Sequence, residues 1–111
     1  MKKLFKNYTY EFDKNEKRLL INFCKQAIKQ MESDNRFFPD VRAYSSIIDK
    51  LNEPAENVKL TKDELTRLTV QLKENIKFLK KKMETSWFLK KWLYKSLYQQ
   101  YQNILATHFS D

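Results

Sequence analysis

The sequence predicts a mainly α protein, a compact bundle of about four helices in which residues 8–12 and 58–60 can form a short two-stranded antiparallel β pair. Several stretches carry apolar residues at steps of three and four, the spacing of one helix face. Glycine is absent, so a turn that needs a positive φ angle falls to Asn or Asp, which favours helices over hairpins. The 111 residues, 41% of them hydrophobic, supply one modest core, which predicts a single domain over residues 1–111.

The first predicted elements are a strand and a capped helix. We expect residues 1–7 to form a mobile basic arm, and residues 8–12 then alternate aromatic and polar side chains, as in a half-buried strand. Asp13 stands three residues before Glu16, which is the spacing of a capping box at a helix N-terminus. A helix is therefore predicted over 14–32. Its apolar face holds Leu20, Ile21, Phe23, Cys24, Ala27, Ile28 and Met31.

A turn and a shorter helix follow. The first helix ends without a glycine, so we expect Asp34 or Asn35 to supply the turn. Pro39 suits the first turn of a second helix, which ends near Asn52. Cys24, the only cysteine, falls within the apolar face of the first helix, where a buried and inert thiol is expected rather than a nucleophile.

The third helix is the one that the sequence marks best. After the extended residues 58–60, Thr61 and Glu64 repeat the capping-box spacing. The apolar seam behind them consists of Leu65, Leu68, Leu72, Ile76, Leu79 and Met83. Neither glycine nor proline interrupts the chain beyond this point, so the sequence leaves open whether 62–109 forms one helix or two.

The two capped segments align when the chain is shifted by forty-eight residues, which places Tyr10 on Val58 and Asp13 on Thr61. One interpretation is that any two capped amphipathic helices resemble each other. The other is that the chain contains two equivalent strand–helix units whose short strands pair. Two units are too few for a solenoid, which needs about three repeats to bury its faces.

A final helix is predicted over 87–109, capped by Thr85 or Ser86. Phe88 and Trp92 fall away from its core-facing side. That core-facing side holds Leu93, Tyr94, Leu97, Tyr98, Tyr101, Ile104, Leu105 and His108.

The positive charge is concentrated toward the two ends of the chain. The formal net charge is +8, to which residues 1–31 contribute +5, residues 32–79 contribute −1 and residues 80–111 contribute +4. If the two ends lie together, they form a lysine-rich face suited to phosphates, anionic lipid or an acidic protein. The alternative is that the charge only keeps the protein in solution.

Enzyme chemistry finds little support in the sequence. Without glycine there is neither a Walker A loop nor a dinucleotide-binding fingerprint. A single His and a single Cys do not make the usual zinc site. We therefore expect a non-catalytic protein that has no catalytic residues, metal, cofactor or small-molecule substrate.

One group combines exposed aromatic and basic residues: Phe88, Lys90, Lys91, Trp92 and Lys95, with Lys80, Lys81 and Lys82 upstream. We expect it to bind a protein partner or a second copy of the chain, since aromatic residues are enriched in interface cores. The alternative is sequence-independent nucleic-acid binding, because aromatics stack on bases while lysines contact phosphates. A third interpretation is that Phe88 and Trp92 pack against the second helix or the N-terminal arm.

Binding to a membrane surface is unexpected, because the apolar face of the final helix is needed for the core of so small a domain. The start of the chain lacks a signal peptide's apolar segment, and no stretch approaches the length of a membrane span, so we expect a cytoplasmic protein. The Lys, Asn and Ile bias suggests an AT-rich bacterial or phage genome.

Overall fold

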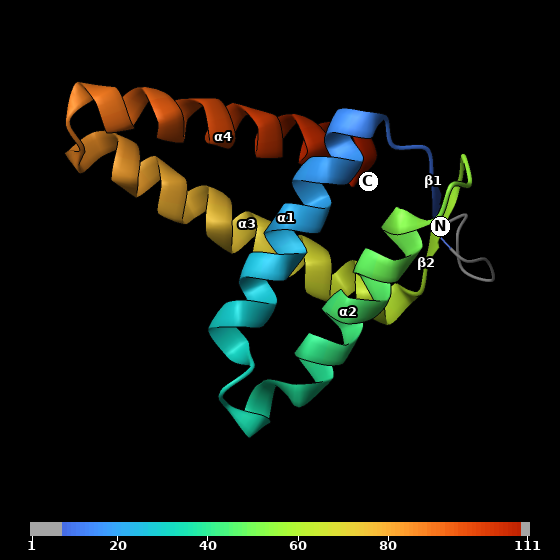
Figure 1. Ribbon diagram of the computed structural model, residues 1–111. Helices are drawn as coiled ribbons and strands as arrows, with labels where there is room; N and C mark the ends of the chain where they lie inside the picture. Colours follow the sequence, from blue (N-terminus) through green and yellow to red (C-terminus); the bar gives the residue numbers. More distant parts are fainter. Residues whose placement is uncertain (1–7, 110–111) are drawn as a thin grey trace. The chain divides into compact units, whose positions relative to one another are not determined.

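The computed structural model describes residues 8–109 and has the predicted fold class: it is mainly α, with four α-helices and one two-stranded antiparallel sheet (Figure 1). The predicted arm at residues 1–7 lies outside the described residues. In chain order the elements are β1 (Tyr8–Tyr10), α1 (Lys14–Met31), the short 3₁₀ helix η1 (Asn35–Phe37), α2 (Phe38–Asn52), β2 (Val58–Leu60), α3 (Lys62–Thr85) and α4 (Phe88–His108).

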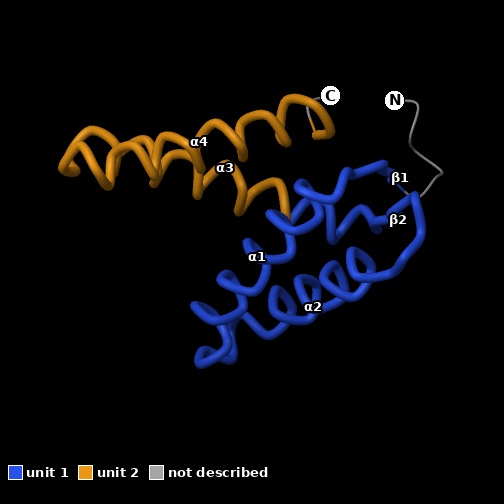
Figure 2. The backbone as a smooth tube through the Cα atoms, turned by 45° about the horizontal axis from the view of Figure 1, so that its top comes forward, with its two compact units in different colours: residues 1–67 blue, residues 68–111 orange. Residues whose placement is uncertain are grey.

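The chain divides into two compact units, residues 1–67 and residues 68–111, coloured blue and orange in Figure 2. The first unit contains the sheet, α1, α2 and the first turns of α3. The second contains the rest of α3 and the whole of α4. The single domain predicted for residues 1–111 stays a prediction, and each unit is described by itself below.

The sheet of the first unit confirms the predicted strand pair. Tyr8 pairs with Leu60 and Tyr10 with Val58, in antiparallel register. The first strand is shorter than predicted, since it ends at Tyr10 instead of residue 12. Phe12 is nevertheless buried, and its ring stacks on Tyr10 with 5.6 Å between the ring centroids. The aromatic alternation therefore marked the buried side of this segment correctly, although pairing stops early.

Both predicted capping boxes form. The Asp13 carboxylate accepts from the Glu16 N–H at 2.7 Å, and the Glu16 carboxylate accepts from the Asp13 N–H at 3.0 Å. At the start of α3 the Thr61 hydroxyl accepts from the Glu64 N–H at 3.1 Å, and the Glu64 carboxylate accepts in return at 2.9 Å. Tyr10 pairs with Val58 in the sheet. The same two residues are aligned when the sequence is shifted by forty-eight residues. The two capped helix starts are thus arranged around one residue pair, as two equivalent strand–helix units require.

Helices α1 and α2 pack against each other in the first unit and are joined by η1 (Figure 1). The turn predicted for Asp34 or Asn35 is made by the Asp34 side chain, which accepts from the Arg36 N–H, while its backbone φ is −120°. No residue among 8–109 has a positive φ. The described residues therefore turn without the left-handed backbone that glycine usually provides, and between α1 and η1 the Asp34 carboxylate caps the turn instead. Pro39 lies in the first turn of α2, as expected.

Residues 62–109, which the sequence left open as one helix or two, form two helices. Helix α3 ends at Thr85, the chain reverses at Ser86 and Trp87, and α4 runs back as the second arm of a helical hairpin (Figures 1 and 2). The predicted cap at Thr85 or Ser86 is wrong. The Thr85 hydroxyl donates to the Lys81 carbonyl of its own helix at 3.3 Å, and Trp87 occupies the N-cap position of α4 without a side-chain hydrogen bond.

Burial in the second unit follows the predicted α3 seam but only part of the predicted α4 face. Leu68, Leu72, Ile76 and Leu79 are buried on α3, and Tyr101 and Ile104 on α4. Leu93, which was predicted to face the core, is 51% exposed. The apolar residues near the start of α4 are thus left in solvent, and burial is confined to its second half. Across residues 8–109, no helix combines the length and the apolar character needed to cross a membrane.

Candidate functional site

All eight sequence-predicted site residues lie around the turn of the α3–α4 hairpin. We define the hairpin tip as residues 80–95, which comprises the end of α3, the connection at Ser86 and Trp87, and the first two turns of α4. Helix α3 brings three of the predicted residues to this place and α4 brings the other five. Every one of them is exposed: Lys80, Lys81, Lys82, Phe88, Lys90, Lys91, Trp92 and Lys95.

The hairpin tip also carries three large apolar side chains that the sequence-based site did not include. Trp87, Leu89 and Leu93 are 80%, 74% and 51% exposed, beside Phe88 at 71% and Trp92 at 73%. We call these five residues the apolar cluster. At this exposure, neither Phe88 nor Trp92 is packed into the core of its own unit. No signal in the sequence marks the exposure of Trp87 and Leu89, because the uncapped start of α4 is seen only in the structure.

The apolar cluster occupies one side of α4. Phe88, Leu89, Trp92 and Leu93 follow the i, i+1, i+4, i+5 spacing that places side chains within one arc of a helix. Two lysines flank this arc at positions three and seven residues after Phe88, and these are Lys91 and Lys95. The first turns of α4 are therefore amphipathic in an unusual way, because the apolar arc faces solvent and the lysines line its edge.

The charge of the hairpin tip is strongly positive. Residues 80–95 contain six lysines and one acid, Glu84, for a formal charge of +5. Lys80, Lys81 and Lys82 lie in the last turns of α3, where cations complement the negative end of the helix dipole. The Lys82 ammonium also lies 5.5 Å from the ring centroid of Phe78, which is itself 53% exposed. Helix α4 begins at the same place with no acidic residue in its first turn, so the positive end of its dipole offsets the negative end of α3 and the lysines set the sign of the field.

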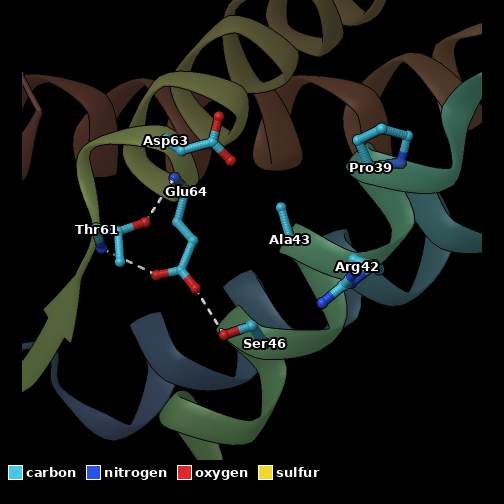
Figure 3. Close-up of a pocket in the computed structure, with 7 residues that line it drawn as sticks. All are labelled: Pro39, Arg42, Ala43, Ser46, Thr61, Asp63 and Glu64. Carbon is cyan, nitrogen blue, oxygen red and sulfur yellow. Dashed lines mark hydrogen bonds between the residues drawn. The ribbon is translucent and has the colours of Figure 1, made fainter.

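A second, polar arrangement lies in the first unit, at a shallow depression of about 380 Å³ between α2 and the start of α3 (Figure 3). The Glu64 side chain is 9% exposed and points from α3 toward α2. One carboxylate oxygen accepts from Lys50 Nζ at 2.7 Å and from the Thr61 N–H, and the other accepts from the Ser46 hydroxyl at 2.6 Å. The depression is lined by Pro39, Arg42, Ala43, Ser46, Thr61, Asp63 and Glu64.

The environment of Glu64 favours its ionised form. Burial by itself raises the pKa of this carboxyl, but hydrogen bonds from Lys50, Ser46 and the Thr61 backbone outweigh burial and hold the pKa below its ordinary value. A carboxylate that stays ionised and accepts three hydrogen bonds is poorly suited to act as a general acid or base. The sequence predicted the capping role of Glu64, but not its burial or its contacts with α2.

Arg67 makes the other polar connection in this region. Its guanidinium pairs with Asp40 of α2 and, at 3.0 Å, with Asp63 one turn earlier on α3. Its backbone carbonyl accepts from the Tyr44 hydroxyl at 3.0 Å. Tyr44 is 1% exposed, and burial, followed by the charge of Asp40, raises the pKa of its phenol. These contacts hold α2 against the first turns of α3. The polar groups of Arg67, Asp40, Asp63 and Tyr44 therefore have a structural role.

Cys24 is fully buried, as predicted, and burial raises the pKa of its thiol to about 12. A thiol that stays protonated is neither a good nucleophile nor a metal ligand. Within the part of the chain that the structure describes, no cluster of three or more His, Cys, Asp or Glu side chains is placed to hold a metal ion. The hairpin tip is therefore the feature with the clearest functional character.

Comparison with known proteins found no matching family model, no matching curated protein and no matching solved structure. The chemistry and geometry of the hairpin tip are therefore the basis for assigning a function to this protein.

Proposed function

We propose that this protein is a non-catalytic interaction module whose binding surface is the hairpin tip. The observation that carries this proposal is the apolar cluster, five large side chains between 51% and 80% exposed within seven residues. Single exposed apolar residues are common on protein surfaces, but a contiguous group of them rimmed by polar residues marks interaction sites.

The free energy available from covering this surface is large. Burying one Leu, Phe or similar side chain contributes about 1.5–3 kcal/mol. Tryptophan and phenylalanine are also the residue types that dominate interface energetics. A partner therefore needs an apolar region to cover the cluster and negative charge to face the lysines around it. We expect such a partner in the cytoplasm, in the form of another protein or a second copy of the chain.

The experiment that tests the proposal uses the tryptophans as reporters. Trp87 and Trp92 are the only two in the chain, so protein labelled with 5-fluorotryptophan gives ¹⁹F signals from the hairpin tip alone. We expect both signals to shift or broaden when total extract of the source cells is added, because the tip becomes covered. Signals that stay sharp and unshifted would contradict the proposal.

A matched variant and a second measurement complete this test. Asn103 lies on the same helix and is exposed, so Asn103→Ser should leave the response to extract unchanged, whereas Phe88→Ser with Leu89→Ser should abolish it. Light scattering on the purified protein tests whether the partner is a second copy of the chain. If the protein is a dimer and the Phe88→Ser, Leu89→Ser variant is a monomer, the hairpin tip mediates self-association.

Nucleic-acid binding is the second candidate, favoured by the six lysines and two exposed tryptophans of the hairpin tip. Tryptophan stacks on bases and lysine contacts phosphates without selecting a sequence. It predicts binding of short single- or double-stranded DNA or RNA that weakens steeply with salt, and that is lost when Lys90, Lys91 and Lys95 become Glu. Polarisation titrations at two salt concentrations measure both, and binding that is indifferent to salt excludes this candidate.

A further inference from the structure

We infer that the surface covered by the hairpin tip is the anionic face of a lipid membrane, into which the apolar cluster inserts while the lysines contact lipid phosphates. This inference rests on the proposed function, because it keeps the hairpin tip as the binding surface and replaces the protein partner expected above with a lipid surface.

The size of the hairpin tip is the first reason. A helix with its side chains is about 10–12 Å across, so the end of a two-helix hairpin presents a face on the order of 10 by 20 Å. A specific protein interface buries about 800 Å² on each partner. The end face alone is well below that area, so a protein partner would also have to cover the side of α4 on which the apolar cluster lies. A membrane has no such threshold, since its affinity grows with each side chain that enters it.

The depth of the apolar cluster is the second reason. From Trp87 to Leu93 the helix rises about 9 Å at 1.5 Å per residue. Amphipathic segments that bind at a membrane surface bury their apolar side about 5–10 Å into the boundary between headgroups and acyl chains. A hairpin that enters tip first would therefore immerse the whole cluster. Trp, Phe and Leu are also the residues that such segments place there.

The arrangement of charge is the third reason. The six lysines of the hairpin tip lie beside the cluster, and their long aliphatic stems allow the ammonium groups to reach headgroup phosphates while the apolar side chains go deeper. A formal charge of +5 complements an anionic leaflet. The second unit, residues 68–111, contains eight lysines and no arginine, and lysine binds phosphate as a point charge without the base-reading geometry of arginine.

The sequence argued against a membrane because the apolar face of the last helix was needed for the core. The structure separates the two requirements along α4. Tyr101 and Ile104, in the second half of the helix, are buried, whereas the apolar cluster in the first two turns is exposed. Docking the tip on a membrane therefore removes nothing from the core.

Vesicle binding tests the inference, with the fluorescence of Trp87 and Trp92 as the readout. The full chain is titrated with vesicles of phosphatidylcholine alone and of phosphatidylcholine with phosphatidylglycerol at a ratio of about 3:1, a composition chosen to give a negative surface potential. We expect a blue shift of the emission with the anionic vesicles alone. We also expect quenching by lipids brominated near the headgroup end of the acyl chain.

Two pairs of variants make the result specific. Phe88→Ser with Leu89→Ser keeps both reporters and should weaken binding at least tenfold. Lys90→Gln with Lys91→Gln should weaken it about 25-fold, because each lysine near an anionic surface contributes about fivefold. The matched control, Lys73→Gln with Lys77→Gln, removes two exposed lysines of α3 outside the hairpin tip and should change binding much less. Circular dichroism checks that each variant keeps its helical content.

Several outcomes would overturn the inference. One is an emission unchanged by anionic vesicles at low salt, and another is equal weakening by the two lysine pairs, which would indicate attraction by net charge alone. If vesicles have no effect while membrane-free extract still perturbs the ¹⁹F signals, the membrane is excluded and the proposed function stands. Nuclease treatment of that extract then separates nucleic acid from protein. If neither vesicles nor extract perturb the hairpin tip, both proposals fail.

Discussion

Glu64 shows how one side chain joins three segments of the first unit. It caps α3 through Thr61, and it receives hydrogen bonds from Ser46 and Lys50 on α2. Its carboxylate is buried, but each of its two oxygens has a donor. Burying a charge is costly unless it is paired and hydrogen-bonded, and here both conditions are met.

We predict that Glu64→Gln lowers the free energy of unfolding by about 2 kcal/mol, because a hydrogen bond to a charged group contributes about 1.5–3 kcal/mol. The loss should stay below that of a fully buried ion pair, since the Lys50 side chain is 31% exposed and can rehydrate. Urea unfolding followed by circular dichroism measures the change. The matched control is Glu74→Gln, an exposed glutamate 3.8 Å from Lys77, which should change stability by less than about 0.5 kcal/mol. Equal effects at the two sites would contradict this account of Glu64.

The contribution of Glu64 should also depend on pH in a defined direction. The pKa of Glu64 in the folded protein lies below the value in the unfolded chain, which is about 4.3 for a glutamate. The stabilisation is therefore fully present above that unfolded pKa and is lost as the pH falls through the folded pKa. We expect the stability difference between the natural protein and Glu64→Gln to be constant from about pH 6 to 8 and to shrink below about pH 4. A difference that grows on acidification would be inconsistent with the lowered pKa.

At this scale the sequence predicts local contacts and misses distant ones. The Thr61–Glu64 box was predictable because both partners lie within one helical turn. Ser46 and Lys50 lie eighteen and fourteen residues before Glu64, and they reach it only because α2 is placed beside the start of α3. No periodicity in the sequence encodes that placement.

Among the helices, α4 stands out by how it begins. Trp87 has the extended φ and ψ angles of an N-cap residue (−61° and 156°), but its indole makes no capping hydrogen bond. The N-terminal N–H groups of α4 thus lack the side-chain acceptor that Asp13 and Thr61 give to α1 and α3. A large apolar residue at a position that favours Asp or Ser suggests that exposure of the indole is worth more to this protein than the stability of the helix start.

We predict that Trp87→Asp stabilises the protein by about 1 kcal/mol, because the carboxylate can accept from the free N–H groups and complements the helix dipole. Trp87→Ala provides the control, since it removes the indole without adding an acceptor. Thermal unfolding distinguishes the two. The same Trp87→Asp protein should bind anionic vesicles more weakly than the natural protein, since it places a negative charge in the apolar cluster. A destabilised Trp87→Asp would show that the indole supports the fold.

Helix boundaries were predictable where a cap defines them. The predicted starts of α1 and α3 agree with the structure, and each is set by a capping box. The break between α3 and α4 was not predictable, because no glycine or proline marks it and Thr85 continues the helix by donating to Lys81. Exposure of the residues after that break was not predictable either, since the same apolar spacing serves a core or a binding surface.

For the molecule as a whole, the two compact units carry different kinds of residue. The first holds the polar contacts of Glu64 and Arg67 and the only cysteine. The second holds the hairpin tip and both tryptophans. On α4 no residue from 88 to 100 is buried, so few tertiary contacts protect the backbone hydrogen bonds of its first half.

We predict that the first half of α4 opens without unfolding the first unit. Each rate is divided by that of the unprotected group to give an opening equilibrium. Opening at the amides of residues 91–100 should be at least tenfold more populated than opening at Cys24 reported by iodoacetamide, because Cys24 reacts only when the first unit unfolds. Mass spectrometry follows both reactions, on peptides cut after quenching for the amides of residues 91–100 and on the intact protein for Cys24. Equal opening free energies at residues 91–100 and at Cys24 would indicate that the chain unfolds as one cooperative domain, as the composition of the sequence predicts.

The backbone of this protein has a consequence for how its surface can be mapped. Glycine does not occur, and none of residues 8–109 has a positive φ. Replacing a residue by alanine therefore never forces a Cβ atom into a left-handed conformation, which is the usual source of misleading losses at turns. An alanine scan through the turn at residues 32–37 and the hairpin tip adds no Cβ atom at any position, so lost binding without lost stability identifies the residues that contact the partner.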